Sequence, residues 1–245
     1  MTKELHDNVS RVKRFNVLGT SIFVGLRAAD VLLQQSLLQR GWASSLIQLV
    51  GGHPVGVDLM LDPATAQLRP YYNIISMMAL GSSVKQILTM VIVSEQDTPL
   101  ASAIVIALFN TIFNSLNTVF SVWAATSQLP TQGITESPSV LLGVGFYTIG
   151  ILTEMTSELQ RTYFKKNPAN KGKPYAGGLF SLARHINYGG YTIWRAAYAY
   201  TAAGWPWGLA AGSFFFFDFA TRGVPVLDNY LANRVSGPFC PQDKV

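Results

Sequence analysis

Residues 98–135 read TPLASAIVIALFNTIFNSLNTVFSVWAATSQLPTQGIT, a stretch dense in Ile, Leu, Val and Phe that holds no charged residue. A helix crosses the hydrocarbon core of a membrane with ~20 mostly apolar residues, because every backbone N–H and C=O must be satisfied inside the segment. Residues 196–217 form a second uncharged run that is rich in aromatic side chains. Both runs are longer than soluble core helices need, so the sequence predicts an integral membrane protein built of α-helices.

The composition agrees with a membrane protein, since 49% of the residues are hydrophobic and only 13% are charged. The net charge of +5 does not indicate a nucleic acid partner, because the basic residues gather in loops between apolar segments. That placement is typical of cytosolic loops beside membrane spans. Cys240 is the single cysteine, which excludes a disulfide framework and a cysteine-based metal site. No histidine pair has metal-ligand spacing either, so no metal is expected.

The apolar segments predict an all-α, polytopic transmembrane bundle of six or seven spans that forms one membrane domain over residues 1–245. The second segment is interrupted by Gly51, Gly52 and Pro54, so a re-entrant or interfacial segment is the alternative there. A polar tail at residues 1–14 precedes the bundle, and a tail at residues 221–245 follows it. The expected spans are residues 15–38, 41–60, 71–94, 99–126, 138–160, 178–202 and 204–220.

The connection at residues 165–174 is the most hydrophilic part inside the chain and carries four lysines. Short loops with this many positive charges stay on the cytosolic side of a membrane. We therefore expect this loop in the cytosol, with the other loops alternating around it.

Several charged residues lie within or at the edge of the expected spans, where each costs at least ~2.5–3.5 kcal/mol unless it faces a partner or a cavity. For any single charged residue there are two interpretations. It can have a structural role, by extending its charge to the membrane surface or by forming an ion pair, or it can have a functional role. Together they predict a polar interior. The residues are Arg27, Asp30, Lys85, Glu154, Glu158, Arg184, Arg195 and Asp218.

Asn110, Asn114 and Asn117 recur at spacings of four and three, so they share one face of a helix. Such a stripe either joins neighbouring helices by hydrogen bonds or forms the polar wall of a substrate cavity. We take the second interpretation and expect these three amides to bind substrate. Walker, Rossmann and Gly-x-Ser-x-Gly signatures are absent from the sequence, so a nucleotide would be held in another way.

Residues 154–203 are similar to the C-terminal half of the steroid 5α-reductase superfamily, which includes enoyl and sterol reductases and, more remotely, isoprenylcysteine carboxyl methyltransferases. Three elements carry the resemblance, in matching order and spacing. They are residues 157–161 (SELQR), residues 177–180 (GGLF) and residues 184–191 (RHINYGGY), the last resembling an Arg-His-Pro-Asn-Tyr-x-Gly-Glu pattern.

The resemblance implies that residues 154–203 bind NADPH at the cytosolic membrane surface. If the family's residue roles apply here, Glu158 and Lys165 contact the adenosine end of NADPH. Asn187, Tyr188 and position 191 then lie near its nicotinamide ring. Lysines hold phosphates by charge-assisted hydrogen bonds, and an asparagine offers a donor and an acceptor to a carboxamide. Arg184 and His185 complete the expected cofactor-binding set.

The function implied is reduction of an activated C=C bond in a lipophilic, sterol- or terpenoid-like substrate. NADPH would supply the hydride, and the proton donor is expected among Lys85, Glu154 and Tyr191. The substrate would enter from the membrane lipid, and the endoplasmic reticulum is the compartment that the superfamily implies.

The chain departs from the family pattern at Ile186, where the family has proline, and at Tyr191, where it has glutamate. These departures favour an alternative, a cofactor-free isomerase or cyclase that would use Glu154, Asp218 or His185 in acid–base chemistry. A lipid-binding protein without catalysis is a third possibility. Methyl transfer, the activity of the methyltransferase branch of the superfamily, is the least expected of these functions.

Overall fold

The fold is taken from a computed structural model that describes residues 13–54, 68–127, 137–171 and 173–235, with side chains as far as residue 229. Within these ranges the secondary-structure elements are all helical, and strand pairing is limited to one isolated β-bridge between Lys13 and Gln96, which confirms the all-α class. The helices are α1 (Val17–Gln39), α2 (Trp42–Leu49), α3 (Arg69–Leu88), α4 (Leu100–Ser127), α5 (Pro138–Lys166), α6 (Ile186–Asp218) and α7 (Val224–Val235). Short helical turns are η2 (Thr89–Val93), η4 (Pro168–Asn170), η5 (Gly178–Ser181) and η6 (Phe219–Gly223).

Four helices of the described chain are long and apolar enough to cross a membrane: Val17–Gln39, Arg69–Val93, Leu100–Ser127 and Pro138–Lys166. They confirm four of the expected spans, with α5 continuing past the expected end at residue 160. Particular residues in the sequence mark where the helices begin. The Asn16 side chain caps α1 by accepting the Gly19 N–H at 2.9 Å, and Pro138 opens α5, where a missing N–H breaks no helical hydrogen bond.

The expected span at residues 41–60 does not form as one helix. Gly41 adopts a left-handed φ of 68°, which ends the run begun by α1, and α2 then has only 8 residues. At 1.5 Å per residue α2 is about 12 Å long, far short of a hydrocarbon core of about 30 Å. Residues 55–60 of the expected span lie outside the described residues.

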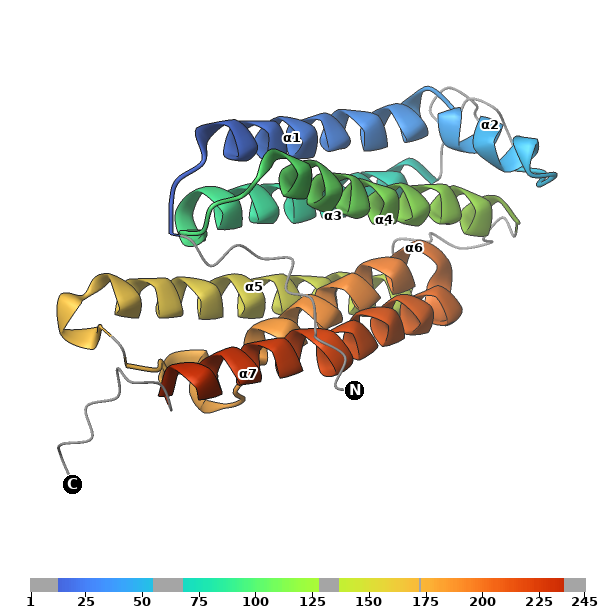
Figure 1. Cartoon of the computed structure of the whole chain (residues 1–245). Coiled ribbons are helices and arrows are strands. Elements are labelled where there is room, and N and C mark those ends of the chain that lie inside the picture. The colour runs from blue at the N-terminus through green and yellow to red at the C-terminus, as the bar shows by residue number, and fades with distance from the viewer. Residues whose placement is uncertain (1–12, 55–67, 128–136, 172, 236–245) are drawn as a thin grey trace, which may run out of the picture.

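Helix α6 contains a break that separates the two spans expected at residues 178–202 and 204–220. Ala203 and Gly204 have non-helical backbone angles, with a left-handed φ of 76° at Gly204, and Pro206 follows. Figure 1 shows the chain turning back at this point. The Tyr71 hydroxyl lies 2.9 Å from the carbonyl oxygens of Thr201 and Ala202, just before the break. The first half begins at Ile186 rather than 178, because η5 and a loop occupy residues 178–185.

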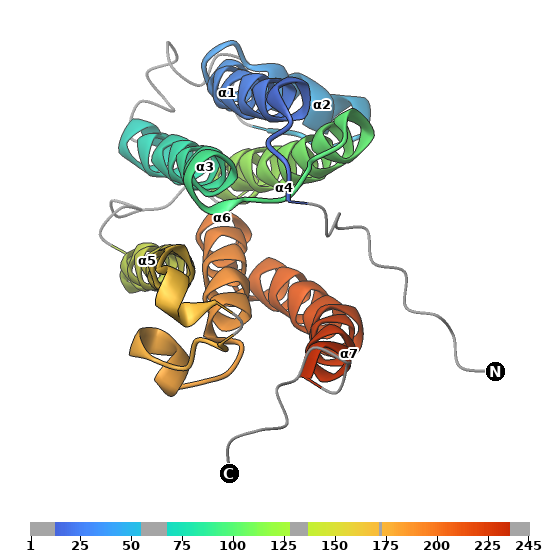
Figure 2. The ribbon, with the colours of Figure 1, turned by 60° about the vertical axis from the view of Figure 1, so that its left-hand side comes forward.

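The helices form two groups, which Figures 1 and 2 show one above the other. One group holds α1 to α4, and the other holds α5, α6 and α7. The first half of α6 packs along α5 and also reaches α4, so it joins the groups. The expected C-terminal tail at 221–245 begins with helix α7, while residues 1–12 and 236–245 of the two expected tails lie outside the described residues.

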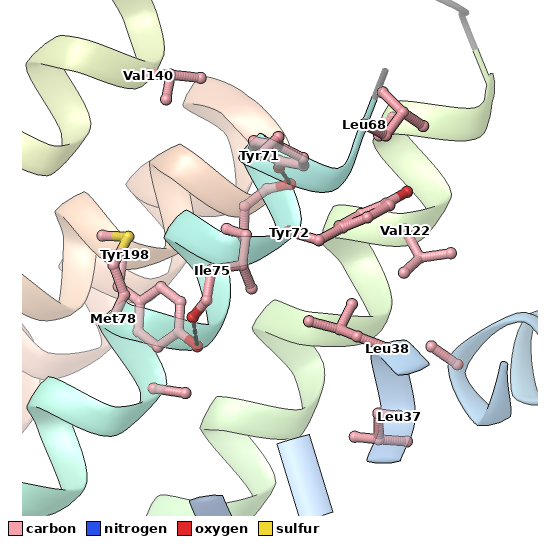
Figure 3. Close-up of a cluster of buried hydrophobic side chains, with 14 of the residues drawn as sticks. Leu37, Leu38, Leu68, Tyr71, Tyr72, Ile75, Met78, Val122, Val140 and Tyr198 are labelled. Atoms are coloured by element: carbon pink, nitrogen blue, oxygen red, sulfur yellow. Dashed lines mark hydrogen bonds between the residues drawn. The ribbon is translucent and has the colours of Figure 1, made fainter. Parts of the chain in front are cut away.

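The largest cluster of buried apolar side chains takes residues from both groups, from α1 to α6. Figure 3 shows its centre, where the Tyr198 hydroxyl of α6 donates to the Ile75 carbonyl of α3 at 3.3 Å. The lipid-facing surface is apolar too, as expected for helices that stand in a membrane. The packing between the two groups of helices therefore holds α3, α5 and α6 in fixed positions. Polar side chains of these three helices meet beside the buried apolar cluster.

Candidate functional site

Three side chains predicted to be catalytic come together from three helices. The Lys85 ammonium on α3 forms a buried ion pair with the Oε1 atom of Glu154 on α5. Its nitrogen also lies 5.7 Å from the ring centre of Tyr191 on α6. The other Glu154 oxygen accepts the indole N–H of Trp194 at 2.7 Å. A carboxylate, an ammonium and a phenol thus share one buried site, the composition that proton transfer requires.

Two glycines allow α5 and α6 to approach closely enough for this site to form. A Cβ atom on Gly190 would lie 2.8 Å from the backbone nitrogen of Glu154 and 2.9 Å from the Gly150 carbonyl oxygen. A Cβ atom on Gly150 would in turn lie 2.6 Å from the backbone nitrogen of Trp194. Side chains at either position would separate the helices. The glycine pair therefore sets Glu154 against Trp194.

A second cation, Arg195, lies next to this site and is 2% exposed. Its Nε atom donates to the Tyr191 hydroxyl at 3.1 Å, and its Nη2 atom donates to the Oδ1 atom of Asn110. Gln86 donates to the same Asn110 oxygen at 2.6 Å. Tyr191 contacts both the Lys85 ammonium and the Arg195 guanidinium, so the residues predicted to be catalytic are continuous with Arg195, Asn110 and Gln86.

The three amides expected to line a substrate cavity have different partners. Asn110 accepts from Gln86 and Arg195 as above, and Asn114 donates to Asp30 on α1 at 2.7 Å. Asn117 accepts the indole N–H of Trp207 at 2.7 Å. Their substrate role stays a prediction. In the described structure each amide joins its helix to a neighbour, and Asn110 alone of the three borders the catalytic residues.

The expected cofactor residues are partly brought together where α5 ends and α6 begins. Asn187 donates to Oε1 of Glu158 at 2.8 Å, and Arg161 pairs with the other Glu158 oxygen. Both Glu158 and Asn187 are buried. Lys165 is exposed in the last turn of α5, and its charge reaches the loop before α4, where it helps lower the pKa of Glu95 behind the larger effect of the Lys13 hydrogen bond. Lys165 therefore lies at the exposed edge of the expected cofactor region.

The GGLF element packs against α5 through the Gln160 amide and through the Phe180 ring, which lies 5.7 Å from the Arg161 guanidinium carbon. Gln160 Oε1 accepts the Leu179 N–H at 2.9 Å. Gly178 has a left-handed φ of 55°, and a side chain there would collide with Gln160. The glycine is therefore required by the backbone turn and by this contact.

Aromatic rings border the other side of the expected cofactor region. The Tyr188 ring stacks on Phe219 with 4.4 Å between the ring centres and on His185 with 5.6 Å. The Arg184 guanidinium lies 3.0 Å from the carboxylate of Asp228 on α7, and the His185 Nε2 atom lies 3.6 Å from it. Burial lowers the pKa of His185, the nearby Asp228 carboxylate opposes this shift, and the Arg184 charge adds to it.

A groove of about 310 Å³ opens toward lipid between α3 and α5. Its wall includes Met77, Met78, Val144 and Tyr147. The Tyr147 ring packs edge-on against Trp194, with 6.0 Å between the ring centres. Since Trp194 binds Glu154, two aromatic side chains separate the groove from the buried carboxylate.

The prediction of site residues omitted Trp194, Arg195 and Gln86. Tyr191, Trp194 and Arg195 stand at spacings of three and four on α6, so helical periodicity places them on one face. Gln86 follows Lys85 directly. The spacing around Tyr191 was therefore the signal that would have identified the two α6 residues.

Comparison with known proteins identifies two similarities. The sequence model of the family described as "Protein of unknown function (DUF1295)" matches residues 88–235. That family is associated with steroid 5α-reductase-like proteins, while membership of the superfamily itself stays a prediction. A protein of Ustilaginoidea virens named "Probable O-methyltransferase ustE" is 37% identical over 236 residues, which cover 92% of this chain and 83% of that protein. No solved structure matches the chain.

Proposed function

Since the chain belongs to the DUF1295 family, whose function is unknown, we propose from its geometry and its relative that it is a membrane enzyme that methylates an oxygen atom of a lipophilic substrate. The observation that carries this proposal is the similarity to a protein named as a probable O-methyltransferase along 92% of the chain. The buried pair of Lys85 and Glu154 supports it, because it places acid–base groups inside the bundle. Methyl transfer, which the sequence ranked last, thus comes ahead of reduction.

The proposed topology has six crossings, made by α1, α3, α4, α5 and the two halves of α6. The starts of α1, α4 and α6 and the ends of α3 and α5 then share one membrane side, which we call the basic end. Lys13 pairs with Glu95 across this end, joining the α1 entry to the α3–α4 loop. The positive-inside rule places it in the cytosol, and an endoplasmic reticulum membrane fits this orientation. Its described basic residues are Lys13, Arg14, Lys165, Lys166, Lys171, Lys173, Arg184 and Arg222.

The residues at the basic end fit a nucleoside cofactor such as S-adenosylmethionine. Glu158 and Asn187 offer a buried carboxylate and amide, which suit the hydroxyl groups of a ribose. The stacked Tyr188 and Phe219 rings offer flat surfaces to a base or to a sulfonium cation. When bound, this cofactor supplies an electrophilic methyl group.

The chain itself would orient the acceptor oxygen and take its proton. Glu154 is the group that accepts the proton of a substrate hydroxyl, and the Lys85 ammonium stabilises the oxygen anion that remains. Trp194 holds the Glu154 carboxylate in place through its indole N–H. Substrate would reach these groups from lipid through the groove between α3 and α5, past Tyr147 and Trp194.

Isothermal titration of the purified, detergent-solubilised protein with S-adenosylmethionine and with NADPH tests this function. We expect binding of S-adenosylmethionine, and its loss in a Glu158→Gln variant. Transfer of a labelled methyl group to a lipid extract would identify the substrate. Binding of neither cofactor, together with turnover of a substrate, would contradict methyl transfer and support the isomerase or cyclase.

Reduction with NADPH is the second candidate, and the charge of the basic end favours it. A dinucleotide with phosphates is strongly anionic, and Arg161, Lys165, Lys166 and Arg184 lie around the predicted cofactor residues. Under this reading Tyr191 replaces the family glutamate near the nicotinamide. NADPH binding that weakens in Tyr191→Phe, with no affinity for S-adenosylmethionine, would support the reductase.

A further inference from the structure

Arg195 is a buried cation without a carboxylate partner among the described residues. Its guanidinium carbon lies 4.3 Å from the ring centre of Trp194 and 5.3 Å from that of Phe215. Two of its nitrogens have hydrogen-bond acceptors, in Tyr191 and Asn110, but its Nη1 atom has none. Aromatic faces stabilise such a cation only in part, and a buried charge without an ion pair is costly inside a membrane.

Arg27 shows how the same bundle treats a buried arginine with a structural role. It is 0% exposed, and its Nη2 atom lies 3.1 Å from the Asp30 carboxylate. The same nitrogen donates to the Ser83 hydroxyl at 2.8 Å. The charge of Arg27 is thus balanced within the protein, while the charge of Arg195 is not.

An unused acceptor belongs to a side chain that neighbours Arg195. Gln86 is 8% exposed, and its Oε1 atom is buried without a hydrogen bond. The Gln86 and Arg195 side chains are neighbours, because both donate to the same Asn110 oxygen. A buried polar group without a partner costs roughly as much as a lost hydrogen bond. A free donor on a cation beside a free acceptor is the arrangement that binds the oxygen of an acidic hydroxyl group.

We propose that Arg195 and Gln86 bind the acceptor oxygen of the substrate, and that this oxygen belongs to an acidic group, such as a carboxylic acid, phenol or enol, on a lipophilic molecule. While the group is protonated, Gln86 accepts its hydrogen bond; the proton then passes to the Glu154 carboxylate, and Arg195 shares with Lys85 the stabilisation of the anion that remains. Tyr191 lies against both Arg195 and Lys85, so the oxygen would stay close to the proposed proton acceptor. This inference rests on the proposed function, since it names the substrate class of that site.

Equilibrium dialysis of the purified protein in detergent tests the proposal with two probes, 2-naphthoate and its neutral methyl ester. Wild type should retain the anion in preference to the ester. Arg195→Gln should weaken anion binding by ~10–100-fold, because hydrogen bonds to charged groups are the strong ones, and should leave the ester unaffected. Arg27→Gln, which removes the other buried arginine, is the control and should keep the preference for the anion.

Gln86→Glu tests the same site without removing a cation. A carboxylate beside Arg195 would supply the missing partner, so this variant should melt at or above the wild-type temperature and lose naphthoate binding. Equal affinity of wild type for both probes would overturn the proposal, as would naphthoate binding that survives in Gln86→Glu. These outcomes do not depend on methyl transfer: activity without anion preference contradicts only the inference, and anion preference without transfer contradicts only the proposed function.

Discussion

The indole nitrogen of Trp194 lies 2.7 Å from the Glu154 carboxylate, which is 40 residues earlier in the chain. The Trp194→Phe substitution keeps an aromatic ring but removes the donor and part of the buried ring volume. We expect the free energy of unfolding to fall by ~1–3 kcal/mol, because a buried carboxylate loses one hydrogen bond. Methyl transfer should also slow. Thermal unfolding in detergent measures the first effect, and Trp205→Phe, at a tryptophan that is 70% exposed, should change little.

The contact between Gly150 and Gly190 gives a prediction with a control in the next residue. Gly190→Ala should destabilise the protein by ~1–3 kcal/mol, since the added Cβ atom would lie 2.8 Å from the backbone of Glu154. Gly189→Ala has open space around its Cβ atom and should be neutral or slightly stabilising. Equal melting temperatures for the two variants would contradict the close helix packing.

Asn187→Ala should weaken cofactor binding. The substitution removes the amide that donates to Glu158 at 2.8 Å, so the carboxylate loses its orientation toward the cofactor. The loss of one such hydrogen bond should reduce the free energy of cofactor binding by ~1–3 kcal/mol. Titration with S-adenosylmethionine and NADPH measures the change, and Asn229→Ala on the exposed face of α7 is the control. An unchanged affinity in folded Asn187→Ala would remove this residue from the site.

His185 should make the stability of the protein depend on pH. Its pKa in the folded state is lowered from 6.5 mainly by burial, near Asp228, Arg184 and Tyr188. A lowered pKa means that the unfolded state binds a proton first as the pH falls. The stability linked to His185 is thus complete above about pH 6.5 and is lost as the pH falls through the folded pKa.

Melting temperatures between pH 7.5 and pH 5 test this effect of His185. The wild type should lose more stability over this range than His185→Gln, which cannot take up the proton. Parallel curves for the two proteins would show that the histidine does not contribute.

The orientation of the basic end is tested by labelling. A cysteine at Asn170, in a variant whose native Cys240 is replaced by serine, should react with a membrane-impermeant reagent only from the cytosolic side, because the lysines around it resist translocation. Labelling from the opposite side in sealed vesicles would reverse the topology. The Cys240→Ser protein without the new cysteine is the blank.

Many features of the fold are local, and these were predictable from the sequence. The run that became α4 needs no distant partner to be a membrane helix, because its own apolar side chains and its own backbone hydrogen bonds satisfy the lipid environment. The same holds for α1, α3 and α5. The break in α6 was also visible, since Gly204 and Pro206 are residues that interrupt helices.

The site was predictable only in part, because its contacts join residues far apart in the chain. Sequence reasoning selected Lys85 and Glu154 as charged groups at membrane depth and Tyr191 from the family pattern. It did not show that Lys85 and Glu154 pair across 69 positions. Arg27 and Arg195 differ already in the sequence, because Asp30 follows Arg27 at helical spacing, whereas no acidic residue lies within four positions of Arg195.

The tertiary structure decides what surrounds Arg195 and what pairs with Lys85. Among the described residues, packing sets amides and aromatic rings around Arg195, whereas Asp30 pairs with Arg27 within α1. Hydropathy determines which segments enter the membrane, since it depends on each segment alone. The pairing of Lys85 with Glu154 and the surroundings of Arg195 depend on how the helices pack, here through the Gly150–Gly190 contact, and no local pattern contains that information.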